Sequence, residues 1–445
     1  MLFILQIAIG LVILGILVLI HELGHFLMAK AWRIRVLTFS IGFGKPIVKK
    51  TINGTEYRIG AVPFGGYVSM PGERPEDDAA PKPGDFNSKS PGQRALVALA
   101  GPAANYLFAM ILLWVMFLSG VEKPIYLDKT VIGAVADSSA AKQAGLCPGD
   151  SIISINGRKT ENWESVQGAL SSRSSVVRVV FVRDGRTDTI NFAMPTIQGR
   201  GVPRQPFAGL YSPLPAIIGS VNAGSPAEKA GLRPHDTVVS INGQLIHSWF
   251  QLSEIIAHVN PSAGPLSFMV RRTDSLAVVA ILPEYKKDLH RYLIGAAVMS
   301  PPVKKVRYSF PEAAAQTLSK SWEYTVMIFD VVAKLVSKQV SMQQLAGPVG
   351  IVQMSGVVAM GGLAAILDFM ALIGINLAVI NLLPLVITDG GLLLFLFIEF
   401  LRRKPLAVKY QAIVNRIAIA FFITLFIYVT FNDIARIPEL FRLMK

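Results

Sequence analysis

Two histidines and a glutamate near the start of the chain have the spacing of a metal site. They occur in the run His21-Glu22-Leu23-Gly24-His25. Residues i and i+4 of an α-helix lie on one face, so both imidazoles can bind one Zn²⁺ while the glutamate flanks it. Such a glutamate is suited to take a proton from the water that the metal activates. The motif therefore predicts a zinc site with His21 and His25 as ligands and Glu22 as the catalytic base.

A third ligand is expected from an aspartate far away in the sequence. Catalytic zinc typically has three protein ligands and one open position. Asp389 is the only acidic residue in the apolar stretch 369–398, and a lone carboxylate in such a stretch needs a cation beside it. We therefore predict one Zn²⁺ per chain, bound by His21, His25 and Asp389. The alternative is that Asp389 only caps a broken helix before the two glycines that follow it.

The composition indicates that these residues belong to a membrane protein. Of all residues 52% are hydrophobic and 16% are charged, whereas about 25% are charged in a typical soluble domain. The apolar residues form blocks at 1–20, 95–118, 369–398 and 417–431, and we expect each to span the bilayer, the last one extended back toward Gln411. The first block lacks the basic start and the cleavage pattern of a signal peptide, so we expect it to remain as a span.

The net charge of +14 follows the expected membrane topology. In a soluble protein this charge would suggest a nucleic-acid partner, but here Lys and Arg gather at 30–94 and 402–416. The positive-inside rule places both segments in the cytoplasm, so we expect no nucleic-acid partner. The N-terminus, the segment 121–360 and the C-terminus are then expected outside the cytoplasm. Cys147 is the single cysteine, which excludes an intrachain disulfide.

The segment between the second and third blocks contains a repeat. Ser139-Ala-Ala-Lys-Gln-Ala-Gly-Leu-Cys-Pro-Gly-Asp150 returns as Ser225-Pro-Ala-Glu-Lys-Ala-Gly-Leu-Arg-Pro-His-Asp236, and Ser-Ile-Asn-Gly follows each copy. This self-similarity indicates a duplicated domain. Each copy predicts a short helix, a turn, a strand and an Asn-Gly hairpin, and the pattern resembles the PDZ domain over roughly 125–195 and 210–290.

PDZ domains bind extended peptides as an added strand. We expect the loops that hold the peptide carboxylate at Ile132 and Gly133 in the first copy and at Ile218 and Gly219 in the second. The alternative is that one copy is a spacer with a closed groove.

Residues 36–70 predict a small antiparallel sheet associated with the membrane. Strand-like runs at 36–41, 56–62 and 66–70 are separated by turn residues. A polar segment at 71–90 predicts a cytoplasmic loop, and 311–345 predicts an amphipathic helix on the membrane surface.

A substrate helix must unwind locally before its peptide bond can reach the metal. An edge of the sheet near Gly42, Phe43 and Gly44 could pair with the unwound segment as an added strand. Asn376, Asn381 and Pro384 in the third apolar block are further candidates for substrate binding, the two amides through side-chain hydrogen bonds.

Five motifs in order resemble the site-2 protease family of intramembrane zinc metalloproteases, in its bacterial form with tandem PDZ domains. They are His21-Glu-Leu-Gly-His25, Arg58-Ile-Gly-Ala-Val-Pro-Phe-Gly-Gly-Tyr-Val68, Ala100-Gly-Pro-Ala-Ala-Asn105, Leu345-Ala-Gly-Pro-Val-Gly-Ile351 and Asn381-Leu-Leu-Pro-Leu-Val-Ile-Thr-Asp-Gly390. The resemblance covers essentially the whole chain. Members usually read Pro-Val-Leu-Asp-Gly-Gly-His at the last motif, where this chain has Thr388 before the aspartate and Leu392 after the glycines.

The resemblance implies zinc held by His21, His25 and Asp389, with Glu22 as the base, and cleavage within the spans of single-pass proteins. Expected substrates are an anti-sigma factor, trimmed first by an upstream site-1 protease, and remnant signal peptides. The PDZ pair would act as a size filter in the periplasm of a bacterium whose inner membrane holds the spans and whose periplasm holds both termini. A zinc protease that cuts loops outside the bilayer and a PDZ scaffold with a vestigial metal site are the alternatives.

The expected fold is a polytopic α-helical membrane protein with four transmembrane helices, a membrane-associated β-sheet and two extracytoplasmic PDZ domains of α+β type. The expected segments are the first span (1–30), the sheet and cytoplasmic loop (31–94), the second span (95–120), PDZ1 (121–205), PDZ2 (206–300), amphipathic periplasmic helices (301–363), the third span with the zinc-ligand aspartate (364–401), and the basic loop, fourth span and tail (402–445).

Overall fold

The computed structural model describes residues 2–73, 82–137, 139–170, 176–193, 209–260, 264–273, 275–286, 291–337, 347–385, 388–404 and 408–443. These residues form two compact units. One unit, here the helical unit, comprises 1–121 and 307–445, and the other, the β unit, comprises the described residues between 122 and 306.

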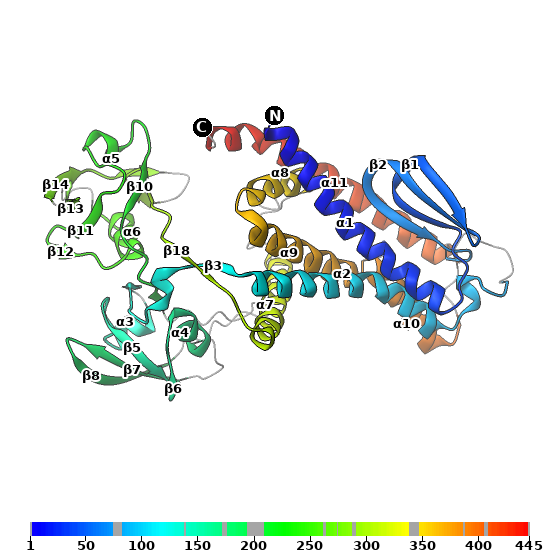
Figure 1. The fold of residues 1–445 in the computed structure, drawn as a ribbon, viewed down its shortest axis with the longest axis horizontal. Helices are drawn as coiled ribbons and strands as arrows, with labels where there is room; N and C mark the ends of the chain where they lie inside the picture. The colour runs from blue at the N-terminus through cyan, green and yellow to red at the C-terminus, as the bar shows by residue number, and fades with distance from the viewer. Residues whose placement is uncertain are drawn as a thin grey trace. The chain divides into compact units, whose positions relative to one another are not determined.

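The helical unit contains the helices α1 (Leu2–Ala31), α2 (Pro91–Ser119), α7 (Phe310–Val336), α8 (Pro348–Ala359), α9 (Gly362–Leu382), α10 (Asp389–Arg402) and α11 (Val408–Leu443), shown in Figure 1. Four of them are long and apolar enough to cross a membrane, over Ile7–Ala31, Pro91–Ser119, Gly362–Leu382 and Ile413–Ala435. This agrees with the number of spans predicted.

The predicted third span is divided into two helices. Helix α9 ends at Leu382, and Leu383 has the extended backbone angles φ −62° and ψ 144°. The residue that precedes a proline is disfavoured in the helical region, so Pro384 ends the helix at this point. Helix α10 starts anew at Asp389, which places the predicted metal ligand in the first turn of a helix and not in the middle of a span.

Helices α1, α2 and α9 pack around a shared apolar core. Leu17 and Leu113 are fully buried there, together with Ile375. Helix α2 begins with a capping box in which Ser90 and Gln93 each bond to the other's backbone N–H group, and Gly120 ends it with φ 99°. The packing holds the metal-motif helix α1 against α2, which carries the predicted Ala100–Asn105 motif.

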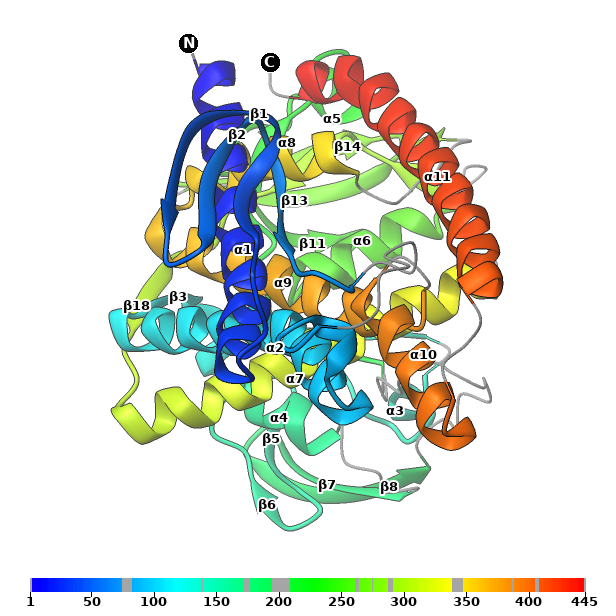
Figure 2. The ribbon, with the colours of Figure 1, turned by 90° about the vertical axis from the view of Figure 1, so that its right-hand side faces the viewer.

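The predicted sheet consists of two long strands, β1 (Thr38–Ile52) and β2 (Thr55–Ser69), joined by the turn Asn53-Gly54. Two of the predicted short strands, 56–62 and 66–70, are parts of the single strand β2, which folds back on β1. Phe39 therefore lies between Val68 on one side and Tyr57 on the other. The two strands contact α1, beside which Figure 2 shows them.

The β unit contains two domains whose described elements follow the same succession, except that the second has an additional hairpin (Glu284–Lys286 and Arg291–Leu293) before its last strand. The first has β4 (Ala134–Val135), α3 (Ala140–Gln143), β5 (Ser151–Ile155), β6 (Arg158–Lys159), α4 (Trp163–Leu170), β7 (Val176–Arg183), β8 (Arg186–Ala193) and β9 (Leu210–Tyr211). The second has β10 (Ile218–Val221), α5 (Pro226–Lys229), β11 (Thr237–Ile241), β12 (Gln244–Leu245), α6 (Trp249–Ala257), β13 (Leu266–Arg272), β14 (Ser275–Ile281), β15 (Glu284–Lys286), β16 (Arg291–Leu293) and β17 (Ala296–Val298). Their sheets run β6-β5-β7-β8 and β12-β11-β13-β14, so the duplicated sequence forms a duplicated fold.

The two domains also repeat one buried ion pair. Asp150 accepts hydrogen bonds from Arg183 at 2.6 and 2.7 Å, and Asp236 accepts them from Arg272 at 2.8 and 3.0 Å. Both carboxylates are almost completely buried, and both belong to the repeated Pro-x-Asp turn. The pair explains why the aspartate recurs in the two copies: it joins the turn to the third strand of each sheet.

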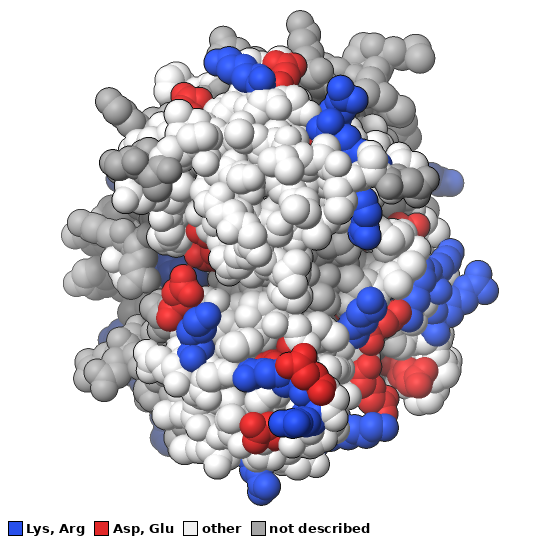
Figure 3. Space-filling model, turned by 90° about the vertical axis from the view of Figure 1, so that its left-hand side faces the viewer, with Lys and Arg blue, Asp and Glu red and all other residues white. Residues whose placement is uncertain are grey.

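Strands β3 (Val121–Pro124) and β18 (Val303–Val306) pair where the chain enters and leaves the β unit, and short 3₁₀ helices lie at Phe86–Ser88 and Ile125–Asp128. On the face in Figure 3, Lys and Arg are interspersed with Asp and Glu in the lower half and along the rim, whereas the upper centre shows other residues. Such a mixture is typical of a solvated protein surface.

Candidate metal centre

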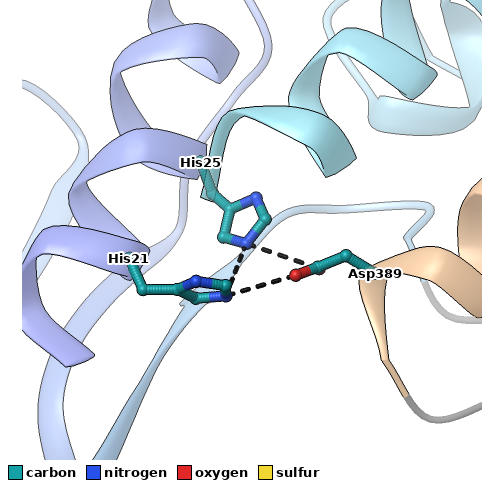
Figure 4. A group of neighbouring side chains, drawn as sticks. All are labelled: His21, His25 and Asp389. Carbon is teal, nitrogen blue, oxygen red and sulfur yellow. Dashed lines mark hydrogen bonds and ion pairs between the residues drawn. The ribbon is translucent and has the colours of Figure 1, made fainter. Parts of the chain in front are cut away.

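The structure brings His21, His25 and Asp389 together. The His21 Nε2 and His25 Nε2 atoms lie 3.2 Å apart, and they lie 3.2 and 3.4 Å from the two carboxylate oxygens of Asp389 (Figure 4). One possible ligand atom from each residue lies within 4.8 Å of the others. The two histidines come from α1, one helical turn apart, and the aspartate comes from the first turn of α10.

The three donors fit zinc. Zn²⁺ binds imidazole nitrogen and carboxylate oxygen, and a catalytic site uses three such donors and one open position. The side chains are only 12–19% exposed, so a carboxylate between two imidazoles would be poorly hydrated there without a cation. His25 Nδ1 lies 2.8 Å from the carbonyl oxygen of Val97, which can accept only from an N–H. The proton of His25 therefore lies on Nδ1, and Nε2 is free for a metal.

Glycines allow α1 and α2 to approach each other at the site. A Cβ atom on Gly24 would lie 2.3 Å from the backbone oxygen of Ala100. A Cβ atom on Gly101 would lie 2.2 Å from His25 Nε2. Real Cβ atoms do not come this close to other atoms, so a side chain at Gly24 would collide with the α2 backbone, and one at Gly101 would displace the His25 ring. Neither contact can be seen in the local sequence pattern, because each depends on the partner helix.

Strand β2 lies beside Glu22. A Cβ atom on Gly66 would lie 3.2 Å from Glu22 Cγ. In β2 the segment from Gly66 to Ser69 pairs with β1 on one side, and no second strand partner is found among the described residues. The sheet therefore presents an edge to the candidate base.

The predicted pairing segment of Gly42, Phe43 and Gly44 belongs to β1. Gly42 and Gly44 have φ of 83° and 87°, and Phe43 is opposite Val62 of β2. The Phe43 ring stacks on Tyr67 with a centroid distance of 6.0 Å. The structure thus brings Gly66 next to Glu22, and the Phe43 ring lies beside the neighbouring residues Gly65 and Tyr67.

The turn before Asp389 is fixed by Thr388. Its hydroxyl donates to the carbonyl oxygens of Leu385 at 2.7 Å and Leu383 at 3.0 Å, on the two sides of Pro384. Gly390 packs so closely on the same turn that a Cβ atom would lie 2.2 Å from the Leu383 oxygen. The threonine that replaces the family's usual leucine therefore holds the metal aspartate against the Pro384 turn.

The other predicted substrate residues lie on α9 and the same turn. Asn376 and Asn381 are half-buried on α9, and Pro384 is exposed. The remaining departure from the family pattern, Leu392, packs against an apolar cluster between α1 and the sheet.

The residues of the predicted peptide-binding loops of the β unit are bonded within their own domains. Ile132 and Ile218 are fully buried in the two domain cores. The backbone N–H groups of Ile132 and Gly133 donate to the oxygens of Asp150 and Tyr211, and that of Ile218 donates to the oxygen of Asp236. A loop that binds a carboxylate needs free N–H groups, and these are already used.

Gly219 is also enclosed. A Cβ atom on Gly219 would lie 2.6 Å from the oxygen of Val298. The neighbouring strands β4 and β10 pair with β9 and β17, so peptide binding at these four positions stays a prediction that would need this pairing to change.

Known proteins resemble the chain over nearly its whole length. The model of peptidase family M50 matches residues 9–425. Protease RseP of Yersinia pestis is 34% identical, with 96% of this chain and 97% of the relative covered. Regulator of sigma-E protease RseP of Escherichia coli is 32% identical, with coverage of 96% and 97%. A Vibrio cholerae relative, named as a zinc metalloprotease, is 35% identical, with coverage of 95% and 97%.

Proposed function

Because this chain belongs to peptidase family M50, the zinc metalloendopeptidases of regulated intramembrane proteolysis, we propose that it cuts the spans of single-pass membrane proteins within the bilayer. The observation that carries the proposal is the meeting of His21, His25 and Asp389 in a unit with four candidate membrane spans. A protease that cuts loops outside the membrane would have no need of a metal site built on the end of an apolar helix.

In the proposed mechanism His21 Nε2, His25 Nε2 and the Asp389 carboxylate hold one zinc ion. Zinc at this place would make a water molecule acidic enough to attack near neutral pH and would polarise the scissile carbonyl. Glu22 receives the proton of the attacking water on its carboxylate and passes it to the leaving nitrogen. Val97 keeps the proton of His25 on Nδ1 throughout.

The substrate span must unwind before its peptide bond can react, and its freed backbone groups then need partners. We propose that the edge of β2 from Gly66 to Ser69 supplies them by strand addition. Support comes from the closeness of Gly66 to Glu22 and from the absence of a second strand partner among the described residues at that edge. Asn376, Asn381 and the Pro384 turn are proposed to contact the remainder of the unwound segment.

The names of the relatives point to the substrate class. The Escherichia coli relative is called regulator of sigma-E protease. This name supports an anti-sigma factor as the substrate, cut after an upstream site-1 protease has trimmed it, with remnant signal peptides as a second class. We propose that the two domains of the β unit are periplasmic PDZ domains that exclude untrimmed substrates. The basic residues at 30–94 and 402–416 support this orientation in an inner membrane, with both termini in the periplasm.

The test is cleavage of a truncated single-span substrate by the purified full-length protein in liposomes, with the cut position mapped by mass spectrometry. We expect a cut inside the span that disappears in Glu22→Gln and on zinc chelation. A cut outside the span would establish the loop-cutting protease instead. If wild type and Glu22→Gln both bind zinc and neither cuts, the chain is a scaffold with a vestigial site.

A further inference from the structure

Asn105 of α2 is a buried polar residue beside the metal centre that the mechanism does not yet use. Its side chain has no exposed surface. Its Nδ2 atom lies 3.4 Å from His21 Nδ1. Its Oδ1 atom is buried and has no hydrogen-bond partner among the residues that the structure describes. Buried carbonyl oxygens almost always accept a hydrogen bond, so a buried oxygen without a partner needs an explanation.

The explanation lies in the two nitrogens of His21. Nε2 points at Asp389 and at His25 Nε2, so it is the nitrogen that would bind zinc. A neutral imidazole that binds a metal through Nε2 carries its proton on Nδ1. His25 has Val97 as the acceptor for this proton, whereas the group that faces Nδ1 of His21 is the amide of Asn105.

An asparagine amide can form a hydrogen bond with either tautomer of His21, because it can donate through its NH₂ group or accept through its oxygen. The NH₂ group of Asn105 faces Nδ1, and this fits a ring whose proton is on Nε2, the tautomer that cannot bind zinc through Nε2. A half-turn of the amide exchanges its oxygen and its nitrogen, and the choice between the two orientations follows from the hydrogen bonds. After this turn Oδ1 accepts from Nδ1–H, and the NH₂ group takes the buried place that the oxygen held.

We propose that Asn105 is the positioning residue of His21: its amide oxygen accepts the Nδ1 proton and thereby keeps Nε2 free for zinc. The inference rests on the proposed role of His21 as a zinc ligand. Partners that fix ring orientation and tautomer in this way typically change metal affinity 10- to 100-fold when they are removed. Asn105 would thus do for His21 what the Val97 carbonyl does for His25, with a side chain in place of the backbone.

The experiment measures zinc affinity of the full-length protein in detergent by competition with a chelator, together with the visible spectrum of the cobalt-substituted site. Asn105→Leu removes the acceptor, and we expect zinc binding about 10- to 100-fold weaker and a changed cobalt spectrum. Asn105→Asp keeps an acceptor oxygen at the same place, and we expect affinity close to wild type. Thr317→Val is the matched control, because the Thr317 hydroxyl is also buried without a partner among the described residues, on α7.

Two outcomes would overturn the inference. Wild-type zinc affinity in Asn105→Leu would leave Asn105 with a packing role only. An equal loss in Asn105→Leu and Asn105→Asp would show that the acceptor is not what matters, and the aspartate variant decides the question even if the leucine variant fails to fold. Absence of zinc binding by the wild type would instead refute the proposed function, so the two failures are distinguishable.

Discussion

Gly101 of α2 and His25 of α1 occupy adjoining space at the metal centre, since a Cβ atom on Gly101 would lie 2.2 Å from His25 Nε2. The absence of a side chain at Gly101 therefore sets the position of the imidazole that we propose as a zinc ligand. The Val97 carbonyl, one turn earlier in α2, holds the other nitrogen of the same ring at 2.8 Å. One face of α2 thus fixes both the place and the tautomer of His25.

Replacing Gly101 by alanine should displace His25. The added methyl group cannot share space with Nε2, so either the ring rotates away from Asp389 or the helices separate. We expect zinc affinity to fall at least about tenfold, the range found when groups that orient a ligand are disturbed. Gly92→Ala in the same helix is the control, because no atom lies within 4 Å of the Cβ position there. Equal zinc content in the two variants after dialysis against a chelator would refute this account of Gly101.

Thr388→Val should loosen Asp389. The substitution keeps the shape of the side chain but removes the hydroxyl that donates to Leu383 and Leu385. A lost hydrogen bond of this kind costs about 0.5–1.5 kcal/mol, so we expect zinc affinity to fall by up to about tenfold and the melting temperature to decrease. Thr388→Ser retains the hydroxyl and should restore most of both. Should serine and valine behave alike, the hydroxyl would have no part in holding the aspartate.

Asn381→Leu separates substrate binding from metal binding. Asn381 is half-buried near the end of α9 and is not among the three metal donors. We expect slower cleavage of the truncated single-span substrate, with zinc affinity as in wild type. Leu382→Ala, at an exposed position next to it, serves as the control. Unchanged cleavage by Asn381→Leu would remove this residue from the substrate path, and a parallel loss of zinc would assign it to the metal centre.

The three metal-binding candidates could be predicted because each belongs to a recognisable pattern in the local sequence. The i and i+4 spacing of His21 and His25 is a property of one helix, and Asp389 is a single acid in a long apolar block. The repeat likewise predicted two β domains, because the same residues recur in the same order. Such predictions need only the order and spacing of residues along the chain.

The residues that support the centre could not be predicted, because their roles arise between elements. Gly101 and Asn105 have their roles through contacts with His25 and His21 of α1. The spacing of residues within α2 does not predict these contacts. The position of Gly66 beside Glu22 depends on how β2 folds back on β1, which the sequence of neither strand reveals. At Ile132 and Ile218, likewise, the strand pairing of β4 with β9 and of β10 with β17 is set by distant segments and could not be read from the local sequence.

Asp433 joins the last predicted span to the start of α8, and its removal should release this contact. The Asp433 carboxylate, 4% exposed, accepts from the backbone N–H groups of Gly347 at 3.1 Å and Gly350 at 2.8 Å. It thus caps the N-terminus of α8 from a different helix, where a negative charge is also favoured by the helix dipole. Asp433→Ala should lower the stability by about 0.5–2 kcal/mol, the range measured for lost N-caps.

Thermal unfolding in detergent and limited proteolysis near residue 347 measure this effect. We expect a lower melting temperature and faster cutting in Asp433→Ala, since the first turn of α8 loses its acceptor. Asp433→Asn keeps one acceptor oxygen and should be intermediate, and Ile434→Ala at the exposed neighbouring position is the control. If Asp433→Ala melts and is cut like the Ile434 variant, the carboxylate does not hold α8, and the packing of apolar side chains alone must keep α11 in place.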